Sequence, residues 1–153
     1  MAILNIGDTA PAFKAEDQDG NMVTSDDFKR EKIILYFYPK DNTAGCTAEA
    51  CSLRDGYPQL AREGFVVLGV SPDKSASHRN FIEKHSLPFT LLVDKDHKIA
   101  ETYGTWGEKK MYGRSYMGML RTTFVIGTDG KIEKIFTKVD TKNHFNQILD
   151  SYK

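Results

Sequence analysis

Two cysteines, Cys46 and Cys51, are the residues whose type and position could do chemistry in this 153-residue chain. Cys46 lies between an apolar, β-rich run that ends at Pro39 and a segment of helical composition, residues 44–62. We therefore expect Cys46 in the first turn of a helix, beside unpaired backbone N–H groups and the positive end of the helix dipole. Both favour the thiolate, so the position predicts that Cys46 is a nucleophile.

The spacing of the two cysteines limits how they could react with each other. In an intact helix, positions five residues apart differ by roughly 7.5 Å of rise and about 140° of rotation. A disulfide usually needs Cα atoms within about 4.4–6.8 Å. A bond between Cys46 and Cys51 would therefore require residues 47–52 to unwind. Gly45 and the sequence at residues 56–58, interpreted as a break or kink in the helix, would lower the cost of that change.

The cysteine pattern argues against two other kinds of site. A thioredoxin-type motif has two residues between its cysteines, whereas this pair has four. A structural zinc site is disfavoured because two cysteines supply only two ligands and the histidines show no close pairing. These histidines are His78, His85, His97 and His144. We expect no metal and no cofactor, while an inert buried thiol stays an alternative, more so for Cys51 than for Cys46.

The rest of the chain alternates predicted strands and helices. Strands are expected at residues 32–38, 65–70, 89–93, 122–126 and 132–136, and helices at residues 44–62, 75–85 and 142–152. Residues 12–15 and 21–24, on either side of an Asp-Gly turn signal, predict an N-terminal hairpin. This order predicts an α/β fold with a central mixed β-sheet flanked by helices, in one domain over residues 1–153. The loop from Pro39 to Cys46 follows a strand's carboxyl end, where such folds usually place a site.

The balance of charge gives no reason to expect a nucleic-acid or membrane partner, since 21 basic residues match 21 acidic ones. Trp106, Tyr112 and Tyr116 alternate with basic residues, and we interpret this segment as a partly exposed loop rather than a nucleic-acid surface. No apolar run approaches the roughly 20 residues that span a bilayer, and the first residues lack the pattern of a secretory signal. We therefore expect a cytoplasmic protein.

From Pro39 to Cys46 the sequence resembles the peroxiredoxins, whose motif is Pro, three residues, Thr or Ser, two residues and Cys. The motif reads here Pro39, Thr43 and Cys46. The further Cys51 is similar to the bacterioferritin comigratory protein or PrxQ subgroup, and so are residues 7–13, 53–55, 106–109 and 121–124. One departure is Ala44, where the subgroup often has proline, and it should leave the loop less pre-organised.

The resemblance implies a thioredoxin-like fold and the reduction of hydrogen peroxide and organic hydroperoxides through a sulfenic acid on Cys46. It implies that Cys51 closes an intramolecular disulfide with Cys46, which thioredoxin or a similar dithiol protein then reduces. It also implies that Arg121 lies near the thiolate and that Glu49 orients an arginine. The substrate-binding residues would be Pro39, Thr43, Gly45, Glu49 and Arg121, in a monomeric protein.

Simpler interpretations stand beside these roles. Thr43, three residues before Cys46, could place its hydroxyl on the same side of the turn as a donor, or could merely cap the helix. Without the resemblance, Arg121 is more simply a surface residue in an ordinary ion pair. The alternative to an enzyme is a thioredoxin-fold binding or holdase protein whose cysteines only report oxidation.

Overall fold

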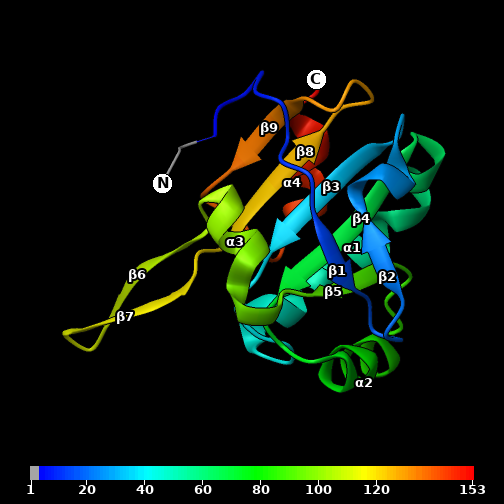
Figure 1. The fold of residues 1–153 in the computed structure, drawn as a ribbon. Coiled ribbons are helices and arrows are strands. Elements are labelled where there is room, and N and C mark those ends of the chain that lie inside the picture. Colours follow the sequence, from blue (N-terminus) through cyan, green and yellow to red (C-terminus); the bar gives the residue numbers. More distant parts are fainter. Residues whose placement is uncertain (1–3) are drawn as a thin grey trace.

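A seven-stranded mixed β-sheet is the centre of the structure, a computed structural model that describes residues 4–153 (Figure 1). The strand order is β2-β1-β5-β4-β3-β8-β9. The three central strands, β3 (Lys32–Phe37), β4 (Phe65–Ser71) and β5 (Thr90–Val93), run parallel. The strands β8 (Thr122–Ile126) and β9 (Ile132–Phe136) extend the sheet antiparallel on one side, and the hairpin of β1 (Lys14–Glu16) and β2 (Met22–Thr24) extends it on the other. The predicted mixed sheet and N-terminal hairpin are confirmed.

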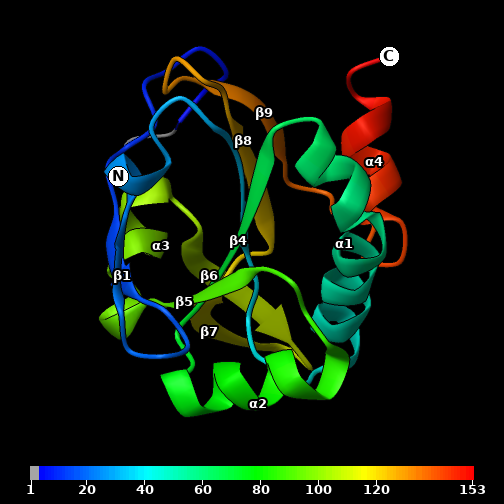
Figure 2. The ribbon, with the colours of Figure 1, turned by 90° about the vertical axis from the view of Figure 1, so that its right-hand side faces the viewer.

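Helices cover both faces of this sheet, as Figure 2 shows. Side chains alternate along β3, so that Ile34 and Tyr36 join one core cluster while Leu35 and Phe37 join the other. The first cluster includes residues of α1 (Ala44–Arg62), α2 (Ser75–His85) and α4 (His144–Asp150). The second includes residues of α3 (Lys98–Tyr103), a helix that the sequence did not predict. The described residues also form two short 3-10 helices, η1 (Ser25–Phe28) and η2 (Lys95–His97).

The expected break in α1 is absent, because the helix runs without interruption through Gly56 and Pro58. Proline removes only one backbone donor, and the buried side chains Leu53 and Leu60 hold the helix on the sheet from both sides of it. Gly56 has a packing role instead. A Cβ at this position would overlap the ring of Phe145 in α4, so the glycine lets the two helices approach closely.

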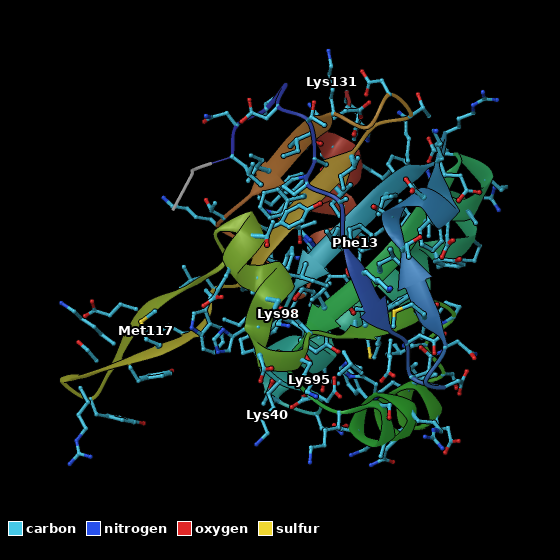
Figure 3. All side chains as sticks on the ribbon, in the orientation of Figure 1. Phe13, Lys40, Lys95, Lys98, Met117 and Lys131 are labelled. Carbon is cyan, nitrogen blue, oxygen red and sulfur yellow. The ribbon has the colours of Figure 1, made fainter. Side chains whose placement is uncertain are left out.

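The segment that we interpreted as a loop is a β-hairpin, made of β6 (Trp106–Met111) and β7 (Arg114–Met119). Its two turn residues, Tyr112 and Gly113, both have positive φ, 53° and 77°, as a tight two-residue turn requires. The hairpin projects from the body of the protein (Figure 1), and Figure 3 places Met117 on this projecting ribbon. The prediction of exposure was therefore right and the prediction of a loop was wrong.

None of the helices within residues 4–153 has the length and apolar character needed to cross a membrane.

Candidate active site

Cys46 lies in the first turn of α1, two residues after the helix begins at Ala44. Thr43 is the N-cap residue and has an extended backbone, which turns the chain from the loop after β3 into the helix. The side chain of Cys46 is almost fully buried, with 1% of its surface exposed. A thiol in this place lies near the helix's unpaired N–H groups and is shielded from bulk water. Only small groups can therefore reach this sulfur.

Arg121 connects the thiol to Glu49. The residue precedes β8, and its Nη2 atom donates a hydrogen bond to Cys46 Sγ at 3.3 Å while Nη1 donates to Glu49 Oε1 at 2.7 Å. Burial lowers the pKa of Arg121, but the charges of Cys46 and Glu49 outweigh burial and raise it above its usual value. The guanidinium is therefore a permanent positive charge beside the sulfur.

Glu49 is fully buried one turn after Cys46, on the same face of α1. Burial raises the pKa of its carboxyl group to about 7, although Arg121 acts in the opposite direction. Within the described residues its second oxygen, Oε2, has no hydrogen-bond partner and lies 3.6 Å from His144 Nε2. Burial also lowers the pKa of His144 to about 4. Near neutral pH, the carboxyl group is therefore close to its titration midpoint and the imidazole is neutral.

A Glu49→Gln variant tests the state of this carboxyl group. Because the folded-state pKa of about 7 exceeds the ordinary 4.5, the folded protein retains a proton that the unfolded chain loses between these values. The contribution of Glu49 to the free energy of unfolding is thus fully present below pH 4.5 and falls by about 3 kcal/mol as the pH rises through 7. Glutamine does not titrate, so urea unfolding at several pH values should show this decline for the parent and not for the variant. If the free energies of unfolding of the parent and the variant changed with pH in the same way, the raised pKa of Glu49 would be wrong.

Thr43 and Gly45 directly precede the thiol at the start of α1, and Pro39 lines a cavity together with Arg121. A Cβ on Gly45 would lie 3.1 Å from Arg121 Nη2, so the glycine leaves room for the guanidinium. The Thr43 hydroxyl donates to the carbonyl of Lys40 at 3.0 Å and makes no capping hydrogen bond to the helix. Its capping role is therefore limited to its backbone.

A buried polar cluster fixes the same loop to α2. The Asp41 carboxylate accepts hydrogen bonds from the hydroxyls of Tyr38 at 2.6 Å and Ser77 at 2.8 Å, and pairs with His78 Nδ1 at 2.7 Å. Burial raises the pKa of Asp41, but the partners, His78 first, lower it below its usual value. His78 Nε2 lies 2.9 Å from the carbonyl of Leu92, which can only accept, so this nitrogen carries a proton. The cluster positions the loop that leads into α1 and Cys46.

A cavity of about 580 Å³ opens beside Arg121. Its walls are mostly apolar, with Pro39, Leu120, Phe124 and Ile135 among the lining residues. Lys109 also lines it, and the amine of this residue donates to the carbonyl of Met119 at 2.9 Å. The cavity therefore offers apolar surface next to two cationic side chains.

Cys51 lies further along the intact α1 and is half-buried, and both cysteines are free thiols. Over the five intervening helical steps, the geometry of an α-helix points the two side chains in directions about 140° apart. Both cysteines are therefore reduced in this structure.

Sequence reasoning missed His144, Asp41 and His78. No spacing in the chain relates residue 144 to residue 49. Asp41 offered one usable signal, because it lies in the loop after a buried strand, where such folds usually place a site. Its partner His78 could not be identified from spacing.

The fold, the buried thiol at a helix start and the adjacent guanidinium together define a thiol-based redox protein of the thioredoxin-like class. The model of the AhpC/TSA family matches residues 6–135. Peroxiredoxin Bcp of Escherichia coli K12 is 46% identical over 150 residues, which cover 98% of this chain and 96% of the relative. Peroxiredoxin Bcp of Bacillus subtilis is 45% identical with the same coverage.

Solved structures that resemble this one include proteins of the same kind. A mutant of PrxQ from Xylella fastidiosa superposes with a TM-score of 0.91 at 31% identity, over 99% of this chain and 97% of that one. The bacterioferritin comigratory protein of Xanthomonas campestris gives a TM-score of 0.86 at 30% identity, over 99% and 96%. This chain belongs to the AhpC/TSA family and is a peroxiredoxin of the Bcp or PrxQ kind. It is a thiol-dependent peroxidase with a peroxide substrate and a thioredoxin-like reductant.

Proposed function

We propose that Cys46 attacks the peroxide and that Cys51 resolves the product by closing an intramolecular disulfide. The observation that carries the first assignment is the hydrogen bond of 3.3 Å from Arg121 to the buried sulfur of Cys46. The same guanidinium is held by Glu49, which fixes its direction. Cys51 is exposed enough to leave its place in the helix, whereas Cys46 is enclosed.

In the first step the Cys46 thiolate attacks the terminal oxygen of a hydroperoxide. The O–O bond breaks, the other oxygen leaves as an alkoxide or hydroxide that takes a proton from solvent, and Cys46 becomes a sulfenic acid. Arg121 stabilises the negative charge that spreads from sulfur to the leaving oxygen. Thr43 serves as a second donor once its hydroxyl turns away from the Lys40 carbonyl. Pro39 and Gly45 shape the entrance.

In the second step the Cys51 sulfur attacks the sulfenic acid and water leaves. The intact helix keeps the two sulfurs apart, so the step requires residues 47–52 to unwind. The contacts that must open with the helix include the ion pair of Arg121 with Glu49 and the hydrogen bond of 3.1 Å from the Phe145 N–H to Ser52 Oγ. Thioredoxin or a similar dithiol protein then supplies two electrons and restores both thiols.

Hydrogen peroxide and organic hydroperoxides are the proposed substrates. The bacterioferritin comigratory protein of Xanthomonas campestris has alkyl peroxide reduction activity. In this chain, the apolar cavity beside Arg121 offers space for an alkyl group whose peroxide faces Cys46. We further propose a cytoplasmic monomer of one domain, which agrees with two core clusters that share a single sheet.

The test is a thiol count after one equivalent of hydrogen peroxide. The enzyme should lose both thiols within the mixing time of a rapid-quench instrument and stay monomeric on a non-reducing gel. A binding or holdase protein whose cysteines only report oxidation should lose them at the slow rate of ordinary thiols. Loss of a single thiol, or a disulfide between two chains, would contradict the role of Cys51.

A further inference from the structure

The thiol of Cys51 faces the side chain of His85 at the end of α2. Cys51 Sγ lies 4.0 Å from His85 Nδ1, the outer limit of a hydrogen bond to sulfur. Arg54 Nη1 donates to the backbone carbonyl of His85 at 2.8 Å, and the ring of Phe81 packs edge-on against the imidazole with centroids 5.3 Å apart. The imidazole is therefore held beside the thiol by contacts from two helices.

We propose that His85 is the base that deprotonates Cys51 for the resolving step, an inference that rests on the proposed function of Cys51. The proton passes from Cys51 Sγ to His85 Nδ1 while α1 is still folded. As the helix opens, the Cys51 thiolate attacks the sulfur of the Cys46 sulfenic acid, the S–O bond breaks, and hydroxide leaves. The hydroxide takes a proton from solvent to become water, and His85 returns its proton to solvent.

Both products of this proton transfer are stabilised where they form. His85 is the last residue of α2, where the partial negative charge of the helix C-terminus attracts a cation. The charged and titratable groups that face His85 from α1, within the described residues, are Cys51 and Arg54. The hydrogen bond to Asp55 is the main cause that raises the pKa of Arg54, and Cys51 raises it further, so the guanidinium and the thiolate attract each other.

The need for a base follows from the chemistry of the step. Near pH 7 an ordinary thiol is only a few per cent thiolate, and the protonated form does not attack sulfenic acid. General bases contribute about 10²–10⁴-fold where proton removal limits a rate. Cys51 is half-buried, and the imidazole of His85 is the side-chain acceptor that contacts its sulfur.

The experiment measures disulfide formation after rapid oxidation of Cys46 by one equivalent of hydrogen peroxide, with acid quench and mass spectrometry between pH 5.5 and 9. In His85→Gln the rate should fall at least tenfold at pH 7, and the deficit relative to the parent should shrink as the pH rises towards 9, because hydroxide then replaces the imidazole as the base. Oxidation of Cys46 itself should keep its rate. Lys84→Gln, an exposed neighbour on α2, is the matched control and should behave as the parent.

A second variant separates a base from a packing role. In His85→Ala, added imidazole should restore the rate of disulfide formation, which a purely structural side chain would not allow. Equal rates and pH profiles in the parent and His85→Gln, or no rescue of His85→Ala, would overturn the role of His85 while leaving the Cys46–Cys51 disulfide in place. If the parent forms no such disulfide, the proposed function of Cys51 fails and this inference fails with it.

Discussion

Replacing Cys46 by serine is expected to reduce peroxide consumption to the background rate of the buffer. The serine hydroxyl stays protonated near neutral pH, so the favourable electrostatics of the helix start and of Arg121 no longer produce an anionic nucleophile. Serine is close in size to cysteine, so α1 should form as before. The measurement is peroxide loss in the presence of thioredoxin and its reductase.

Cys51→Ser is the matched control, because it removes the other thiol from the same helix. This variant should consume one equivalent of peroxide at the parent rate and then stop, with a sulfenic acid on Cys46 that dimedone traps. Continued thioredoxin-dependent turnover in both variants would show that the two assignments are wrong. The same outcome in Cys46→Ser alone would show that Cys51 is the attacking thiol.

Arg121→Met is expected to slow the oxidation of Cys46 by about 10²–10³-fold, the usual cost of removing one donor aimed at developing charge. The variant removes the hydrogen bond to sulfur, and it leaves Glu49 buried without its cation. That carboxyl group can respond by staying protonated, since its pKa is already raised to about 7. The loss should therefore appear mainly in the rate rather than in the fold.

Arg121→Lys separates charge from geometry. An ammonium group retains the positive charge but cannot hold Cys46 and Glu49 at once with the spacing of a guanidinium fork, so its rate should fall between those of the parent and of Arg121→Met. Arg114→Met, on the exposed hairpin, is the control for loss of a positive charge. The rates are the second-order constants of thiol oxidation in stopped flow. A rate for Arg121→Met within threefold of the parent would contradict a direct role of the guanidinium.

Elements with strong local signals could be predicted from the sequence. The bounds of α1 and α2 agree with their predicted ranges, because each helix begins after a loop with turn residues and carries a regular apolar face. The hairpin of β6 and β7 was not predicted because its local signals are weak. Its strands carry Gly, Lys and Glu with little alternation, and its turn uses Tyr-Gly instead of the common Asn-Gly or Asp-Gly.

In the candidate site, too, local sequence predicted some residues, and others required the structure. The place of Cys46 in a first helical turn followed from local sequence, whereas the nearness of Arg121, 75 residues away, could be expected only from the family resemblance. The contacts of His144 with Glu49 and of His85 with Cys51 depend on how α4 and α2 pack against α1. No residue spacing encodes such packing, so these partners required a structure.

The close contact of Gly56 with Phe145 bears on whether turnover and thermal stability can change independently. We expect this contact to hold α1 at residue 56, so that the unwinding proposed for residues 47–52 ends before the second half of the helix. A catalytic cycle would then perturb only the first turns of α1 and leave the sheet intact. Turnover and thermal tolerance can therefore change separately: substitutions that strengthen the sheet should raise the melting temperature of the protein without slowing its catalytic cycle.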